Sequence, residues 1–205
     1  EQQVDRTWMW GPSGHTSPFH ERYDDAPNGE RLVQYFDKSR MEITDPDGDP
    51  DDLWFVTNGR LAWELITGEM QVGDESFESR QPARVPVAGD AHPDSPTYAS
   101  FTLLLNEPAP SQGSVITRTL EPHSGIGDNA NLAHYQVTAA YDVPETGQSV
   151  ASVFWEFMTS SGLIYDSGDR YEASLFENPF FATGFPITGA YWVNVPVGGE
   201  WQDVL

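Results

Sequence analysis

Five aspartates lie close together in one short stretch of the chain, where they could hold a metal ion. The stretch ITDPDGDPDDLW, residues 43–54, places them at positions 45, 47, 49, 51 and 52. Calcium takes about six to eight oxygen ligands at roughly 2.3–2.6 Å, and alternating carboxylates in a tight loop supply several of them. Asp45, Asp47 and Asp49 match the first three ligand positions of an EF-hand-like loop, and Asp51 is a fourth candidate ligand.

The same stretch departs from a calcium loop in its second half. Pro50 stands at the loop's sixth position, where an EF-hand has glycine, and Val56 stands at the twelfth, where it has glutamate. Aspartate, proline and glycine also favour turns, because an aspartate side chain hydrogen-bonds to nearby backbone groups. We therefore favour a solvated turn between two strands, with a calcium site as the secondary hypothesis.

Other residues with catalytic potential are dispersed along the chain. A pair of carboxylates can catalyse glycoside hydrolysis, and Glu64, Glu156 and Glu172 each lie beside an aromatic residue. The chain has 32 acidic residues, so neighbours of this kind also arise by chance, and a carboxylate-pair hydrolase is kept only as an alternative. No G-x-S-x-G motif occurs. The histidines lack the paired spacing of zinc ligands; they are His15, His20, His92, His123 and His134.

Tryptophans give the stronger indication of binding. The seven in the chain are more than one small core requires, and an exposed indole suits the apolar face of a sugar ring. We therefore take Trp8, Trp10 and Trp54 as candidate ligand-binding residues for a cell-wall polysaccharide. For any single tryptophan of the chain, core packing is the interpretation that we favour.

Charge and composition exclude several partners. The formal net charge of -22 opposes binding to nucleic acid and to anionic membranes. The sequence contains no cysteine, so disulfides and zinc-thiolate sites are excluded, and it has no apolar run long enough to span a membrane. A start such as EQQV is typical of a chain after signal-peptide removal, so we expect a secreted or cell-surface protein with no cofactor other than calcium.

The pattern of residues predicts an α+β, β-dominated fold with antiparallel, sandwich-like sheets and three or four short helices. Residues 31–43 alternate like one strand or one arm of a bulged hairpin, with Val33, Tyr35, Met41 and Ile43 facing inward. We expect a short helix within 58–68, a second helix over 149–161, and a hairpin over 163–173. We divide the chain into an N-terminal β-rich region, 1–106, and a C-terminal one, 107–205.

Three segments together resemble a known group of proteins. VQYFDKSRMEI at 33–43, FWEFMTSSGLIY at 154–165 and ATGFPITGAYW at 182–192 are similar to secreted proteins of thermophilic Chloroflexi-type bacteria. They also resemble, distantly, the LGFP-type cell-surface repeat. The resemblance implies an extracellular, wall-associated or polysaccharide-associated module, and it transfers no catalytic residue.

Measured against that repeat, the chain carries two incomplete units. The VQYF strand at 33–36 is the end of a unit whose beginning is missing, and the GFPIT region near the C-terminus begins a unit that lacks its ending. Unpaired strand edges are templates for strand addition. We therefore expect a non-catalytic structural or assembly module that self-associates head-to-tail, into an oligomer or filament, through edges at Val204 and Leu205 and at Val33 and Tyr35.

Overall fold

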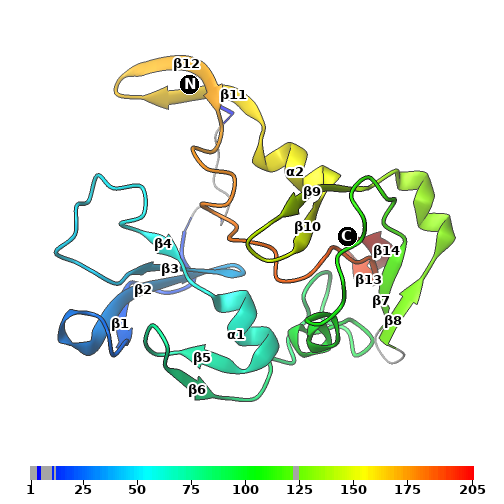
Figure 1. Cartoon of the computed structure of the whole chain (residues 1–205), viewed down its shortest axis with the longest axis horizontal. Coiled ribbons are helices and arrows are strands. Elements are labelled where there is room, and N and C mark those ends of the chain that lie inside the picture. Colours follow the sequence, from blue (N-terminus) through cyan, green and yellow to red (C-terminus); the bar gives the residue numbers. More distant parts are fainter. Residues whose placement is uncertain (1–3, 6–10, 12, 122–124) are drawn as a thin grey trace. The chain divides into compact units, whose positions relative to one another are not determined.

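The computed structural model describes residues 4–5, 11, 13–121 and 125–205 of the chain. It is rich in strands that pair in antiparallel sheets, with short helices between them, which confirms the β-dominated α+β prediction (Figure 1). In the described part of the chain, no helix has both the length and the apolar character needed to cross a membrane.

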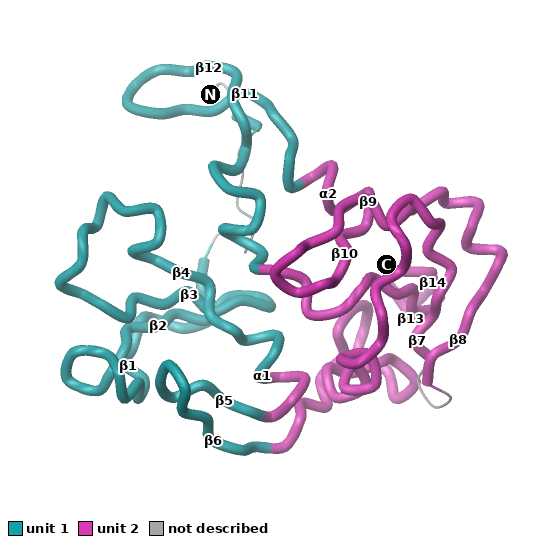
Figure 2. The backbone as a smooth tube through the Cα atoms, viewed as in Figure 1, with its two compact units in different colours: residues 1–64, 69–80, 158–184 teal, residues 65–68, 81–157, 185–205 magenta. Residues whose placement is uncertain are grey.

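The chain forms two compact units, and neither is a continuous piece of sequence. Unit 1 consists of residues 1–64, 69–80 and 158–184, whereas unit 2 consists of residues 65–68, 81–157 and 185–205 (Figure 2). The division therefore differs from the expected sequential halves, 1–106 and 107–205, because the hairpin over 161–174 belongs to the same unit as the N-terminal sheet.

Unit 1 is built on a four-stranded antiparallel sheet. Its strands, in spatial order, are β1 (Phe19–Arg22), β2 (Glu30–Phe36), β3 (Ser39–Ile43) and β4 (Thr57–Asn58). A 3-10 turn, η1 (Pro27–Gly29), links β1 to β2. The unit also contains two two-stranded ladders, β5 (Glu69–Gln71) with β6 (Phe77–Ser79) and β11 (Ser161–Asp166) with β12 (Asp169–Ser174).

Residues 31–43 are extended, but they form two strands, β2 and β3, that pair across a turn at residues 37–38 rather than the one strand or hairpin arm predicted, and the inward face of β3 also differs. The register places Tyr35 opposite Arg40, so Arg40 and the residue two further on share the face of Tyr35. Met41 and Ile43, which we expected to face inward, therefore project to the other face and are only half-buried.

Strand β2 is not a free edge, contrary to the assembly hypothesis. It pairs with β1 on one side and β3 on the other, with Phe19 and Glu42 as the two partners of Val33. Val33 is buried and Tyr35 is half-buried. The two incomplete repeats lie in different compact units, residues 33–36 in unit 1 and residues 185–188 in unit 2. Among the described residues, the strands of one compact unit do not pair with those of the other.

Unit 2 contains three antiparallel two-stranded ladders and the aliphatic core. The ladders are β7 (Arg118–Glu121) with β8 (Gly125–Asp128), β9 (Ala139–Val143) with β10 (Gln148–Ala151), and β13 (Val193–Val197) with β14 (Glu200–Val204). Two short 3-10 helices also lie here, η2 (Tyr98–Leu104) and η3 (Ala130–Tyr135). The backbone of Trp192 links β7 to the start of β13, because its N–H donates to Arg118 O and its carbonyl accepts from Leu120 N, both at 2.9 Å.

The buried apolar side chains of unit 2 form two clusters. The first contains Leu104, Leu120, Tyr191, Val193 and Val195, and the second contains Ile116, Leu132, Val137, Ala151 and Trp192. The Trp192 indole N–H donates to Ile116 O at 2.8 Å, so a buried polar atom is satisfied within the core.

Two helices connect the units along the chain. Helix α1 (Leu61–Thr67) falls within the predicted range and ends at Gly68, whose φ of 77° is suited to a helix C-terminus. Helix α2 (Ser152–Met158) is shorter than the expected 149–161. Residues 148–151 pair as β10, and the chain enters β11 at Ser161, so strand pairing limits the helix at both ends.

Candidate functional site

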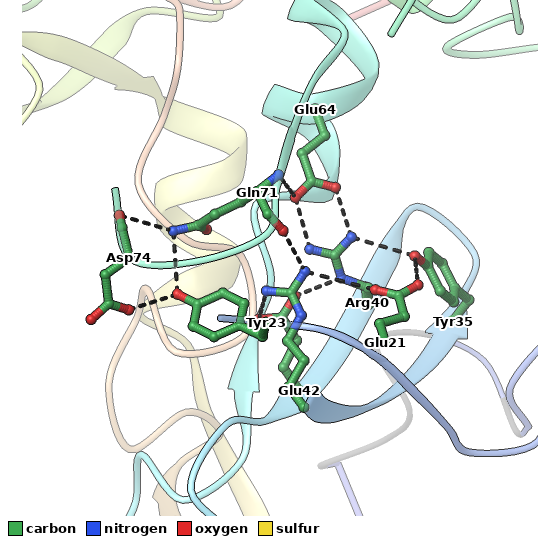
Figure 3. Close-up of polar contacts among 9 residues, drawn as sticks. Glu21, Tyr23, Tyr35, Arg40, Glu42, Glu64, Gln71 and Asp74 are labelled. Atoms are coloured by element: carbon green, nitrogen blue, oxygen red, sulfur yellow. Dashed lines mark hydrogen bonds and ion pairs between the residues drawn. The ribbon is translucent and has the colours of Figure 1, made fainter. Parts of the chain in front are cut away.

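Arg40 lies at the centre of a buried network of charged side chains in unit 1 (Figure 3). The side chain is completely buried, and it donates from Nη1 and Nη2 to the two carboxylate oxygens of Glu64 at 2.7 and 2.9 Å. Its Nε donates to Glu42 Oε1. Burial acts to lower the pKa of Arg40, but the hydrogen bonds to Glu64 and the charges of both carboxylates outweigh it and raise that pKa above its usual value.

Arg31 extends the network from the neighbouring strand. Its Nη1 donates to Glu42 Oε2 at 3.1 Å, its Nη2 donates to Gln71 O at 3.0 Å, and Nη2 lies 3.7 Å from Glu21 Oε2. The guanidinium also lies over the ring of Tyr23, 4.6 Å from the ring centroid. Its Nε is buried without a hydrogen-bond partner among the described residues, so the network contains one unsatisfied donor.

Two tyrosines extend the network through hydrogen bonds from their hydroxyl groups to carboxylates. Tyr23 donates to Asp74 Oδ1 at 2.8 Å, and Tyr35 donates to Glu21 Oε1 at 2.5 Å. Burial, together with the hydrogen bond to Asp74, raises the pKa of Tyr23 to about 12. Burial and the bond to Glu21 raise the pKa of Tyr35 in the same direction. Both phenols are therefore held in their neutral form.

The network changes the interpretation of Glu64 as a catalytic acid. Both of its carboxylate oxygens accept from Arg40, and Oε1 also accepts from the backbone N–H of Gln71 at 3.1 Å. The other two candidates are exposed, Glu156 on α2 in unit 2 and Glu172 on β12 in unit 1. These observations favour a structural role for Glu64.

Gly59 supports the network in a way that the sequence analysis missed. Its backbone N–H donates to Arg40 O at 2.7 Å. A Cβ atom at this position would collide with the carboxylate of Glu42 and would lie 3.0 Å from Arg40 Nε. The turn residues Asn58 and Gly59 signal a loop in the sequence, but no local pattern indicates that a buried carboxylate fills the space beside the glycine.

The acidic loop forms a surface hollow of about 260 Å³ in unit 1. Three carboxylates act as local caps within it: Asp45 accepts from Asp47 N at 3.1 Å, Asp49 from Asp51 N at 2.9 Å, and Asp52 from Trp54 N at 2.7 Å. These bonds confirm the interpretation of the stretch as a turn shaped by aspartate. The lining residues are Thr44, Asp45, Gly48, Asp49, Asp52, Trp54 and Phe55.

The predicted calcium ligands do not converge. Asp45 and Asp49 line the hollow, whereas Asp47 and Asp51 are not among its lining residues. Within the described ranges, no group of three or more histidine or acidic side chains is arranged to hold a metal ion. The calcium hypothesis therefore has no ready set of ligands there.

Trp54 forms one wall of the hollow with its indole still 53 % exposed. Its ring lies 5.6 Å from that of Phe181, centroid to centroid, at an interplanar angle of 58°, so a second aromatic side chain supports it. Trp8 and Trp10, the other two candidate binding residues, lie outside the described residues. Trp192 is buried in the second core cluster, which confirms core packing for this tryptophan. Trp155 stacks on the ring of Tyr141.

The fold and these sites define an acidic, β-dominated α+β protein with a buried ion-pair network and an aromatic surface hollow. Comparison with known proteins finds no matching family model, no matching curated protein and no matching solved structure. The resemblance to secreted Chloroflexi-type proteins and to the LGFP-type repeat therefore stays a prediction.

Proposed function

We propose that the protein is a non-catalytic extracellular module that binds a neutral polysaccharide at the hollow around Trp54. The observation that carries this proposal is the combination, in one hollow, of a half-exposed indole and three aspartates. An indole face packs against the C–H groups of a sugar ring, and carboxylate oxygens accept hydrogen bonds from sugar hydroxyls. Both halves of sugar recognition therefore come from this loop.

The turn bonds prepare the hollow for a ligand. Each of Asp45, Asp49 and Asp52 uses one oxygen to cap the backbone two residues later. Within the described residues, the second carboxylate oxygen of each of these aspartates accepts no hydrogen bond. A loop that is fixed before binding loses less conformational entropy when the ligand arrives, which favours affinity.

Charge supports a neutral rather than an acidic polymer. The walls of the hollow carry carboxylates, and the whole chain has a formal charge of -22. An acidic polysaccharide would meet repulsion both at long range and at the site. A neutral polymer of hexoses avoids this cost and still supplies hydroxyl donors.

The test compares two tryptophans of similar exposure. Trp54→Ala removes the indole of the hollow, whereas Trp201→Ala removes an indole of unit 2 that is 50 % exposed and contacts His92. Binding to a panel of neutral insoluble and soluble polysaccharides is measured by depletion and by affinity electrophoresis. We expect Trp54→Ala to weaken binding about tenfold or more, and Trp201→Ala to leave it unchanged. Equal binding by the Trp54→Ala protein would contradict the proposal.

A second candidate function is self-association through strand β14, because one edge of this strand is unpaired within the described residues. The strand pairs with β13, and the described residues provide no partner on its other side. Val204 packs against the first core cluster, so its side chain is not available to a partner. Any added strand would instead bond to the backbone groups of Trp201 and Asp203, which point outward because ladder pairs alternate from the turn at Gly198 and Gly199.

A proline substitution on the outer edge of β14 tests this candidate function. Asp203→Pro removes an outward N–H without breaking a backbone bond to β13, whereas Asp203→Ala keeps the N–H; both variants lose the same charge and the same side-chain bond from Asn194. Self-association predicts concentration-dependent oligomers in sedimentation velocity, retained by the alanine variant and lost in the proline variant. Monomers at all concentrations and salt conditions would exclude it.

A further inference from the structure

A second hollow, of about 230 Å³, lies within unit 2 and presents opposite charges to its interior. Its polar lining comes from Arg118 and Asp128 together with Ser114, Thr117 and Tyr191. Its volume is below the range of roughly 300–1,000 Å³ that is usual for drug-sized ligands, so only a small molecule fits.

Arg118 and Asp128 are direct cross-strand neighbours that do not pair with each other. They are register partners in the ladder of β7 and β8, which places their Cβ atoms about 4.5–5.5 Å apart. Arg118 Nη1 instead forms an ion pair with Glu107 Oε2 at 3.3 Å and donates to Tyr191 Oη at 3.2 Å. Among the described residues, these two charged groups make no ion pair with each other, so the hollow separates a cation from an anion.

Each charged group keeps atoms for a ligand. Asp128 Oδ1 accepts from Thr117 Oγ1 at 2.6 Å, which fixes the orientation of the carboxylate and leaves Oδ2 available to a ligand. Among the residues that the structure describes, Oδ2 of Asp128 accepts no hydrogen bond, and Nε and Nη2 of Arg118 donate none. The bonds of Arg118 to Glu107 and Tyr191 hold the guanidinium in place in the same way. The hollow therefore offers fixed donors beside a fixed acceptor.

A ligand of a single charge fits this arrangement poorly. A simple carboxylate would bind Arg118 but would meet Asp128, Glu107 and the net charge of -22, and a simple amine would bind Asp128 but leave the remaining N–H groups of Arg118 without an acceptor. A molecule that carries both charges and has no net charge matches both groups and is not repelled at long range. We propose that this hollow binds a small zwitterionic amino acid, with its carboxylate on Arg118 and its ammonium on Asp128.

The expected affinity is modest. Asp128 is exposed and the Arg118 side chain is about two-fifths exposed, so water screens both contacts. A dissociation constant on the order of millimolar follows for glycine, alanine or valine, with the apolar side chain of the ligand against Pro110 and Ala190.

Titration of the full chain with L-alanine, followed by amide chemical shifts in NMR spectra, tests the proposal. Saturable shifts are expected at residues 114–118, 128 and 190–191. N-acetylalanine lacks the ammonium and alanine amide lacks the carboxylate, so each should bind at least about tenfold more weakly. Equal binding of either analogue, or no saturable shift with alanine, would overturn the proposal.

Variants separate the two contacts from folding. Asp128→Asn, at an exposed position, and Arg118→Gln should each weaken alanine binding about tenfold or more, whereas Arg170→Gln, on β12 in unit 1, should not. Arg118 also donates to Tyr191 Oη, so thermal melting of the Arg118→Gln protein checks that the loss of this bond leaves the fold intact. A folded Asp128→Asn protein that binds alanine like the unmodified chain would refute the inference.

Discussion

The middle of the sheet in unit 1 holds two arginines and their carboxylates, whereas the middle of unit 2 holds aliphatic and aromatic side chains. Both clusters of contacting buried apolar residues in the described part of the chain lie in unit 2. In unit 1 the largest fully buried side chains are instead Arg31 and Arg40, each bonded to glutamate.

This difference predicts how each unit responds to substitutions in its interior. Apolar contacts are non-directional, so a core such as that of unit 2 accepts small shifts in geometry. Buried ion pairs are stable only while every partner is present, because the Coulomb attraction must offset a large desolvation penalty. Unit 1 therefore gains a unique arrangement of partners, and the loss of any one of them is costly.

The largest expected effect is the loss of one network partner. Arg40→Met leaves Glu64 and part of Glu42 buried without a cation, so the free energy of unfolding should fall by about 3–5 kcal/mol. Urea denaturation gives the magnitude, and hydrogen exchange should show the loss of protection in residues 30–43. Arg80→Gln breaks an exposed pair with Glu78 and should cost less than about 1 kcal/mol.

A double variant sharpens this prediction. Arg40→Met combined with Glu64→Leu removes a cation and an anion together, so its cost should be clearly smaller than the sum of the two single changes. Additive costs would show that the buried charges act independently.

The next effect concerns the apolar core of unit 2. Leu120→Ala leaves a cavity among Leu104, Tyr191 and Val195, and should lower the free energy of unfolding by about 2–5 kcal/mol. This cost should not change with salt concentration, because it contains no charge term, whereas a salt-dependent cost would break the contrast between the units. Denaturation at low and high salt provides the measurement.

The smallest effect is the pH dependence that Tyr23 gives to the stability of unit 1. The pKa of Tyr23 is about 12 in the folded protein and about 10 in an unfolded chain. The stability that neutral Tyr23 contributes is therefore fully present below about pH 10 and is lost as the pH rises from there towards 12. Tyr23→Phe should flatten the loss of stability over this range, and Tyr171→Phe, at an exposed position on β12, should not. Thermal melts at a series of alkaline pH values compare the variants, and equal slopes would contradict the prediction.

Local pattern was enough to predict much of the fold. The alternation in residues 31–43 indicated extended structure but not the turn at 37–38 that divides it into two strands, and Gly68 follows the end of α1. The inward face of β3 could not be derived in the same way, because a hydrophobic pattern assigns Met41 to the interior and the arginine beside it to solvent. The register across the turn decides otherwise by pairing Tyr35 with Arg40.

The candidate sites depended on contacts between distant parts of the chain. The aspartate turns at 45–54 are local, and the sequence predicted them correctly. The support of Trp54 by Phe181 spans most of the chain, so no spacing rule reveals it. Arg118 and Asp128 become neighbours only once β7 and β8 pair, and neither residue attracts notice in the sequence.

The glycine beside the buried charges carries a further consequence. Any larger residue at Gly59 would displace the carboxylate of Glu42, so the network requires particular residue types at fixed positions in the sequence. These are arginine at 31, R-x-E at 40–42, glycine at 59 and glutamate at 64. A remote homologue that has lost all other likeness should still carry these letters at similar intervals. Such a signature would identify the architecture in genomes where overall identity is too low to detect it.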